Sequence, residues 1–361
     1  MVSPVLISLD AMGGDFGPAV VVAGIRDYRQ RHGGEGVRFL VHGDEAAIAA
    51  EMKRCHLTTE VCEIRHTDKV VAMDEKPAQA MRRGKGSSLW NAIEAVKTGE
   101  AGAVVSAGNT GALMAISKLL LRMAISGLER PAIVASWPTS RGVTAVLDVG
   151  ANIQCDAEQL VEFAIMGEAF HAAVHGVARP TIGLLNIGSE DMKGHDDVRE
   201  AHAILRGGGL DLDYRGFVEG TDIAKGTVDV IVTDGFTGNI ALKTAEGVAR
   251  FISTLMKEAL TSSLQAKLGA LIALPALQRM RQKIDPSAIN GGPLLGLNGI
   301  VVKSHGSADA KGFGNAIRVA VELTRSDYMT KVGTSLQRLV TVLEQPPATV
   351  LDKVPAEESL Q

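Results

Sequence analysis

Short apolar runs recur along the first two thirds of the chain, each followed by a glycine-rich or polar turn and then a helical pattern. They lie within residues 5–15, 37–52, 101–121, 144–167, 181–191 and 228–242. Strands that alternate with helices of ten or more residues predict βαβ units, whose parallel sheet is covered by helices on both faces. We therefore expect an α/β fold with three layers, α/β/α, around a largely parallel sheet.

Residues 246–283 have a different pattern, typical of long helices. Segment 268–277, LGALIALPAL, is almost wholly apolar and has basic residues before and after it: Lys267, Arg279, Arg281 and Lys283. One interpretation is a buried hairpin between core helices. The other is an exposed apolar tip that lies on an anionic membrane surface. In that case the contact residues are Leu268, Leu271, Ile272 and Leu274.

The chain is long and apolar enough for a large core, since 46% of its 361 residues are hydrophobic. We expect one α/β domain over 1–340, with a helical hairpin at about 246–290 as a protruding insertion. Segment 341–361 contains prolines and acidic residues without periodicity, which predicts a disordered tail.

Net charge and cysteine content limit which binding partners and which cellular compartment are expected. The formal net charge of −4 gives no global basic field, so nucleic acid is not an expected partner. The three cysteines are odd in number and form no Cys-x-x-Cys pair, which favours a reducing cytoplasm. No signal peptide is evident, and no apolar run reaches the roughly 18–20 residues needed to cross a bilayer. We expect a cytoplasmic protein, with peripheral contact to the inner face of the membrane as an open alternative.

Common catalytic and nucleotide-binding signatures do not occur. There is no P-loop, no complete dinucleotide fingerprint and no Gly-x-Ser-x-Gly elbow. His171 and His175 lie four residues apart, but without the glutamate of a zinc-protease motif they are expected to be packing or surface histidines. We therefore predict neither a metal site nor a cofactor.

Two loops instead have the composition of an anion site. Segments 106–111, SAGNTG, and 233–239, TDGFTGN, each follow a predicted strand and open a helix. Small residues let the backbone approach a ligand, and the amides at a helix N-terminus favour negative charge. Ordinary helix capping by Thr and Asn is the alternative. Because 148–152 and 186–190 lie at further strand ends, we expect all four loops to line one crevice.

The sequence nominates a set of site residues. The expected phosphate- and substrate-binding groups are Ser87, Ser106, Gly108, Thr110, Gly111, Asn152, Asn186, Asp234, Gly235, Thr237, Gly238 and Asn239. The expected catalytic groups are Asn109, Lys243 and His305. For Lys243 the alternative is a surface ion pair with Glu246, and for His305, which lies near Lys303, it is a structural role.

Several motifs in fixed order resemble one family. They are LDAMGGDFGP, VSAGNTGALMA, LDVGAN, GLLNIGSE, DGFTGNIALKTAEG and GGPLLGLNG with VKSHGSADAKGF, and they span about residues 5–325. Together they resemble the bacterial phosphate acyltransferases of phospholipid synthesis. This resemblance implies a fold similar to that of isocitrate and isopropylmalate dehydrogenases and of phosphotransacetylases.

The resemblance also implies an activity and partners. A homodimer would convert acyl-[acyl-carrier-protein] and inorganic phosphate into acyl phosphate and free acyl carrier protein. The product would feed the membrane glycerol-3-phosphate acyltransferase. The basic stretch 82–88, RRGKGSS, is either a solvated turn or a place where the acidic partner docks.

The chemistry that such a reaction needs agrees with these residues. Phosphate is already anionic at neutral pH, so it needs orientation and desolvation more than activation by a strong base. We predict direct displacement without a covalent enzyme intermediate, and we expect that Asn109→Ala or Thr237→Ala cuts turnover before it harms folding. Rival functions are a phosphotransacetylase-like enzyme that uses acyl-coenzyme A, a metal- and NAD-dependent dehydrogenase, and a non-catalytic membrane-associated scaffold of lipid synthesis.

Overall fold

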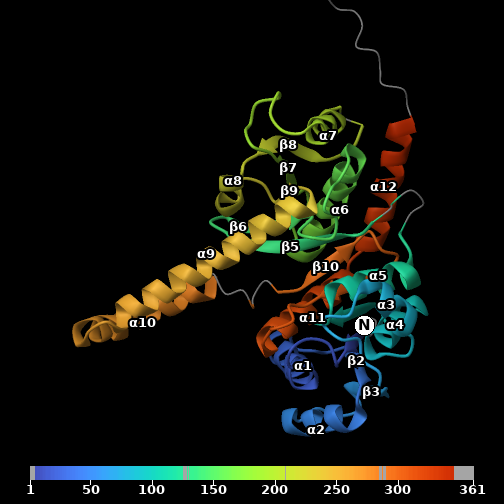
Figure 1. The fold of residues 1–361 in the computed structure, drawn as a ribbon, viewed down its shortest axis with the longest axis vertical. Coiled ribbons are helices and arrows are strands. Elements are labelled where there is room, and N and C mark those ends of the chain that lie inside the picture. Colours follow the sequence, from blue (N-terminus) through green and yellow to red (C-terminus); the bar gives the residue numbers. More distant parts are fainter. Residues whose placement is uncertain are drawn as a thin grey trace, which may run out of the picture.

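A computed structural model of the chain describes residues 5–124, 128, 130–207, 209–283, 287 and 290–344. Within these described residues, helices cover both faces of a single sheet of eleven strands, in the order β3-β2-β1-β4-β11-β10-β5-β6-β9-β7-β8 (Figure 1). The predicted three-layer α/β/α fold is confirmed. The disordered tail predicted from 341 is wrong for its first four residues, because helix α12 (Tyr328–Glu344) continues through them, and from 345 the segment lies outside the described residues.

One half of the sheet is wholly parallel and contains both early and late parts of the chain. Its strands are β1 (Val5–Asp10), β2 (Val37–Gly43), β3 (Cys62–His66), β4 (Ala103–Ser106) and β11 (Ile300–Lys303). Strand β11 therefore joins this half from far along the sequence, next to β4.

The other half is also parallel and comes from the middle of the chain. Its strands are β6 (Gly142–Leu147), β9 (Val230–Val232), β7 (Thr181–Leu185) and β8 (Asp213–Val218). Between the halves lie β10 (Gly292–Leu295) and β5 (Ala132–Thr139). The pairs β11–β10, β10–β5 and β5–β6 are all antiparallel, so the two halves run in opposite directions.

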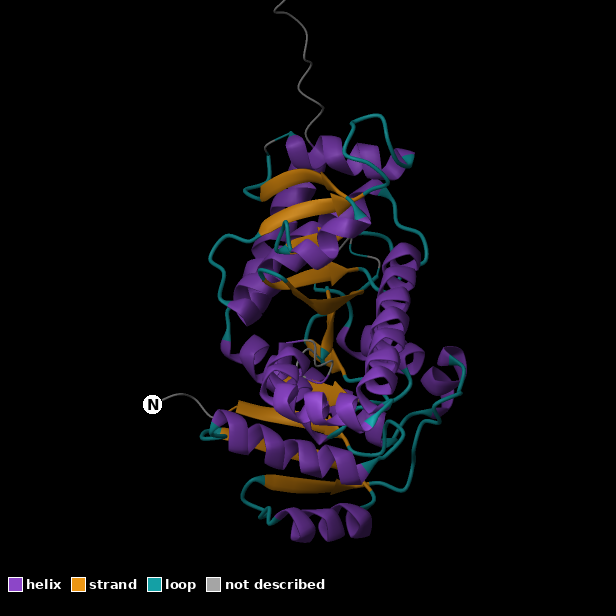
Figure 2. Ribbon diagram, turned by 90° about the vertical axis from the view of Figure 1, so that its left-hand side faces the viewer, coloured by secondary structure: helices purple, strands orange, loops and turns teal. Residues whose placement is uncertain are grey.

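The usual twist between neighbouring strands would offset part of this reversal. Five pairings separate β4 from β9 along the sheet. At roughly 20–25° for each pair, the strand direction turns by about 100–125° between them. Figure 2 shows the strands in the middle of the sheet running at an angle to those at both ends.

The helices divide into two layers according to the core that they bury. One layer contains α1 (Pro18–His32), α2 (Glu45–Cys55), α6 (Ala157–His175), α7 (Asp196–Arg206), α11 (Ala310–Arg325) and α12 (Tyr328–Glu344). The opposite layer contains α3 (Pro77–Arg83), α4 (Ser88–Lys97), α5 (Thr110–Leu121) and α8 (Gly220–Lys225). Strand β4 shows why two layers are needed, because Ala103 and Val105 face the first core and Val104 faces the second.

Two helices extend away from this body as a hairpin. Helix α9 (Gly235–Thr261) leaves the sheet after β9, and α10 (Leu264–Lys283) packs back along it (Figure 1). The sequence placed the hairpin at about 246–290, whereas the first helix already starts at Gly235. A single cap and an uninterrupted helical pattern explain this earlier start, because nothing breaks the helix between the loop and residue 246.

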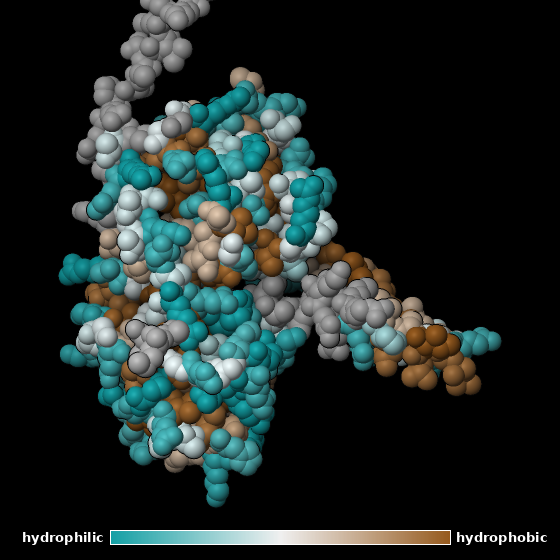
Figure 3. Space-filling model, turned by 180° about the vertical axis from the view of Figure 1, so that it is seen from behind, coloured by the Kyte–Doolittle hydropathy of each residue, from teal (hydrophilic) through white to brown (hydrophobic). Residues whose placement is uncertain are grey.

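The tip of the hairpin exposes apolar side chains. Leu264, Leu268, Leu271 and Ile272 have exposed fractions of 80%, 62%, 67% and 84%. Leu274 is also exposed, and Figure 3 shows the apolar surface that results. The buried-hairpin interpretation is therefore wrong for these residues. The basic residues that follow the apolar segment are Arg279, Arg281 and Lys283, and their side chains lie outside the described ones.

Taken alone, no helix among the described residues has the length and apolar character that crossing a bilayer requires. Helix α9 and the first part of α10 meet that requirement only as a pair, and the pair is bent by 117°.

Candidate active site

Three neighbouring strands of the first half end at one place and bring charged side chains together. Ser106 on β4 is in register with Asp10 on β1 and with Lys303 on β11. The Ser106 hydroxyl donates to Asp10 Oδ2 at 2.7 Å and accepts from the Gly108 N–H at 3.0 Å. Both Ser106 and Asp10 are buried. The predicted donor Ser106 thus holds its own loop against β1.

Burial raises the pKa of the Asp10 carboxyl, and the hydrogen bond from Ser106 partly opposes that rise. Burial also lowers the pKa of the Lys303 amine to about 8, although the carboxylates of Asp10 and Asp15 act in the opposite direction. A partly buried cation and a buried carboxylate therefore share this strand edge.

Asn109 anchors its loop at both ends of its side chain. Its Oδ1 accepts from the Ala112 N–H at 3.0 Å and so caps α5. Its Nδ2 lies 2.9 Å from the Met73 carbonyl and 2.8 Å from the Glu75 carbonyl, with the Ala72 carbonyl at 3.3 Å. An amide group has two hydrogens to donate, so these carbonyls occupy it. The arrangement favours an anchoring role over direct contact with a substrate.

Unlike the Asn109 side chain, the backbone N–H groups at the start of α5 are available to bind a ligand. Those of Thr110 and Gly111 have no hydrogen-bond partner within the described ranges. Unpaired amides of a first helical turn attract anions. Gly111 also allows α3 to approach, because a Cβ there would lie 2.8 Å from Pro77 Cγ. Ser87 is fully buried and caps α4 through the Trp90 N–H.

A second network is built on Asp148 in the other half. Its carboxylate accepts backbone N–H groups from Ile133, Gly150, Ala151 and Asn152, at 2.6–3.2 Å, and also the Asn152 side-chain amide at 2.9 Å. Burial raises the pKa of Asp148, and these donors oppose the rise. Asn152 is buried and donates as well to the Pro131 carbonyl. The network fixes the 148–152 loop.

The start of α9 packs directly on this loop. The Gly235 N–H donates to the Asn152 carbonyl at 2.7 Å. A Cβ at Gly238 would lie 1.9 Å from the Asp148 carbonyl oxygen, so only glycine fits there. Asn239 lies next to Gly150. Two of the four predicted loops are therefore in direct contact.

Asp234 and Thr237 cap α9. The Thr237 N–H donates to Asp234 Oδ1 at 2.8 Å, and the Thr237 hydroxyl donates to Oδ2 at 2.7 Å. Lys243 lies further along α9, 59% exposed, and pairs with Glu246 at 3.2 Å. Of the two alternatives for Lys243, a catalytic role and a surface ion pair with Glu246, the structure contains the ion pair.

The remaining nominated residues lie in exposed loops. Asn186 accepts from the Ile187 N–H and donates to the Lys193 carbonyl, which closes the 186–193 turn. His305 Nδ1 lies 2.9 Å from the Ser307 hydroxyl, and its backbone N–H donates to Asn290 Oδ1. Asn186 and His305 thus stabilise the loops in which they lie.

Described hydrogen bonds link residues within each half, and the two networks belong to different halves of the sheet. The prediction that four loops line one crevice stays a prediction.

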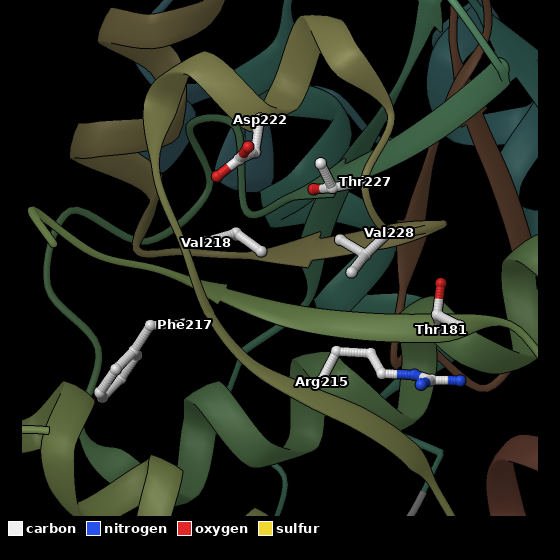
Figure 4. A pocket seen from close by; sticks show the side chains of 7 residues that line it. All are labelled: Thr181, Arg215, Phe217, Val218, Asp222, Thr227 and Val228. Atoms are coloured by element: carbon white, nitrogen blue, oxygen red, sulfur yellow. The ribbon is translucent and has the colours of Figure 1, made fainter. Parts of the chain in front are cut away.

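A separate hollow of about 440 Å³ lies away from these networks. Figure 4 shows the side chains that line it: Thr181, Arg215, Phe217, Val218, Asp222, Thr227 and Val228. They come from β7, β8, α8 and the segment before β9, and none of them is a nominated site residue.

Asp10, Asp15 and Lys303 are not among the site residues that the sequence nominates. The signal that could have raised them is position, since Asp10, Ser106 and Lys303 are the last residues of three strands. The three described cysteines are buried and free. Burial raises the pKa of the Cys155 thiol, which lies near Asp148, to about 12, so it is a poor nucleophile at neutral pH.

Comparison with known proteins identifies the family. A family model described as "Fatty acid synthesis protein" matches residues 5–331. A phosphate acyltransferase of Caulobacter vibrioides is 67% identical over 339 residues, which cover 94% of this chain and 93% of that protein. One of Phenylobacterium zucineum is 58% identical, with 95% and 97% covered. This chain belongs to the phosphate acyltransferase family. It is therefore an acyl-transferring enzyme of lipid synthesis, as the resemblance of its motifs implied.

Solved structures agree on the fold. A phosphotransacetylase from Streptococcus pyogenes superimposes with a TM-score of 0.59 and 18% identity, over 89% of this chain and 94% of that one. The EutD phosphotransacetylase from Staphylococcus aureus gives a TM-score of 0.57 and 16% identity, over 90% and 96%. Members of the phosphate acyltransferase family thus share a fold with enzymes named as phosphotransacetylases.

Proposed function

We propose that this enzyme transfers the acyl group of acyl-[acyl-carrier-protein] to inorganic phosphate, early in phospholipid biosynthesis. One oxygen of hydrogen phosphate attacks the thioester carbonyl carbon and the C–S bond breaks. The proton of hydrogen phosphate ends on the departing sulfur. The products are acyl phosphate and the free thiol of the carrier protein, so no cofactor or external oxidant is needed.

The observation that carries the proposal is the arrangement of the two glycine loops. Their polar side chains are occupied in capping and bracing, which leaves rigid first-turn amides at α5, including those of Thr110 and Gly111, to face an anion. Fixing phosphate beside the thioester contributes about 7–11 kcal/mol through proximity and orientation. One donor on the developing oxyanion is worth roughly 10²–10³ in rate.

The proposal has the α5 and α9 loops bind phosphate and the thioester carbonyl in one cleft. The leaving thiol has a pKa near 8.5, so a strong general acid is not required. Nucleophilic catalysis by a cysteine is also unnecessary, since phosphate itself forms the new bond.

The hairpin supports the proposed partners. Phe251, Ile252 and Leu255 on α9 are exposed and suit a second copy of the chain in a homodimer. The tip residues around Ile272 suit peripheral contact with the inner face of the cell membrane, where the membrane acyltransferase would receive the product. The compartment we propose is the cytoplasm.

The proposed docking site for the carrier protein is the basic surface of α3. Arg82 and Arg83 are exposed at the end of this helix, and neither forms an ion pair with another described residue. Acyl carrier protein is expected to present acidic groups to it.

The decisive experiment measures thiol release that depends on phosphate. Long-chain acyl-[acyl-carrier-protein] and acetyl-coenzyme A are compared as substrates, and acyl phosphate is trapped with hydroxylamine. We expect turnover with the carrier-protein thioester and little with acetyl-coenzyme A. The reverse preference would assign a phosphotransacetylase-like activity, and vesicle binding without any turnover would assign the scaffold function.

A further inference from the structure

The end of β11 places a lysine where loops from three strands meet. Lys303 Nζ lies 3.2 Å from the Ala107 carbonyl, in the loop after β4, and contacts the Ser304 carbonyl. Those two acceptors use two of the three N–H groups of an ammonium. The third N–H remains for a ligand.

Glycines let the backbones close around this amine. A Cβ at Gly13 would lie 2.6 Å from both Asp10 Oδ2 and the Gly108 nitrogen. Gly14, at φ +86°, would place a Cβ 2.9 Å from Ala107 Cβ and 3.0 Å from the Gly306 carbonyl oxygen. No side chain can be added at either position without moving a neighbouring loop. The loops around Lys303 are therefore packed together before any ligand binds.

The surroundings make its charge effective. Asp10 is buried at the end of β1, with β4 between it and β11, and Asp15 lies on the loop after β1, so both carboxylates offset the cost of partly burying the cation. A partly desolvated lysine interacts with an anion more strongly than a solvated one. Lys243 contrasts with it, because it lies on an exposed helix face and is paired with Glu246.

We infer that Lys303, rather than Lys243, supplies the positive charge that binds the attacking phosphate. This inference rests on the proposed function and names the cation of that site. Lys303 acts as a substrate-binding residue: it holds the phosphate oxygens beside the α5 amides, while the bond changes are those of the displacement described above.

The kinetic test varies phosphate at saturating acyl-carrier-protein thioester. We expect Lys303→Met to raise the KM for phosphate by about tenfold to a hundredfold, the effect of losing one charge-assisted hydrogen bond. Lys303→Arg should recover part of that loss, because it keeps the charge. Lys53→Met, which removes an exposed lysine from α2, is the matched control and should behave as wild type. The inference is overturned if Lys243→Met raises the phosphate KM and Lys303→Met does not.

A second test does not depend on acyl transfer or on the variants folding. Lysines of the wild-type protein are modified with an amine-acylating reagent in the presence and absence of inorganic phosphate, and each site is quantified by mass spectrometry. We expect phosphate to protect Lys303, while chloride at equal ionic strength does not. Modification of Lys303 at the same rate in both would overturn the inference even for an active enzyme. Protection without any thiol release would instead contradict the proposed function.

Discussion

Asn109 shows why single residues are hard to assign from a pattern. In the sequence it is a polar residue in a glycine loop before a helix, which suits both a ligand contact and a helix cap. The structure gives it four close partners from two segments, the start of α5 and residues 72–75. The second segment lies more than thirty residues away, so local pattern could not indicate it.

We expect Asn109→Ala to destabilise the fold, because it removes the α5 cap and leaves the loop carbonyls without their donor. The expected loss is about 1–3 kcal/mol in the free energy of unfolding, measured by urea denaturation. Asn109→Asp is the control, since it keeps the acceptor for Ala112 but cannot donate to the loop. Normal stability with lost turnover in Asn109→Ala would instead favour the direct catalytic role that the sequence predicts.

Lys303 illustrates the opposite case. Its partial burial and its two carboxylate neighbours depend on β1, the loop after β1 and β4, which are far from residue 303 in sequence, so nothing local distinguishes it from a surface lysine. The sequence favoured Lys243 as the cation of the site, because it lies one turn beyond a glycine loop. In the structure its side chain lies on an exposed face of α9 and pairs with Glu246.

At the scale of elements, the apolar periodicity predicted most strands and their helices. The three-layer arrangement follows from that alternation, because each strand must bury both of its faces. The antiparallel link through β5 and β10 could not be predicted, since strand pairing between residues 132 and 295 is set by tertiary packing and not by local composition.

The junction of α9 with the 148–152 loop depends on glycine. We expect Gly238→Ala to displace the start of α9, because its Cβ would overlap the Asp148 carbonyl oxygen. The expected cost is about 1–3 kcal/mol of stability, together with reduced turnover. Thermal unfolding and phosphate-dependent thiol release measure the two effects.

Gly247 provides the matched control on the same helix. A Cβ there meets nothing within 4 Å, so Gly247→Ala should leave turnover unchanged and stabilise α9 by up to about 1 kcal/mol. Equal behaviour of the two variants would contradict the tight junction.

At the scale of the whole molecule, the hairpin gives the enzyme an apolar surface on the part that projects from the body (Figure 3). We expect the double substitution Leu271→Gln with Ile272→Gln to weaken binding to anionic lipid vesicles at least about tenfold, because each buried aliphatic side chain contributes about 1.5–3 kcal/mol. Co-sedimentation with vesicles of defined composition measures the effect.

Leu119→Gln is the control for that experiment, since Leu119 on α5 is similarly exposed but lies on the body of the protein. Unchanged vesicle binding in the double variant, with a change in oligomeric state instead, would assign the tip to contact between copies of the chain.

The late arrival of β11 has a consequence for biogenesis. This strand lies between β4 and β10, as the last strand of the first half of the sheet, yet it follows the complete second half in sequence. On a ribosome that adds 5–20 residues per second, the roughly 180 residues from α5 to β11 take about 9–36 s to emerge. Throughout that interval the nascent chain lacks an interior strand, and the edge of β4 that later pairs with β11 has no strand beside it.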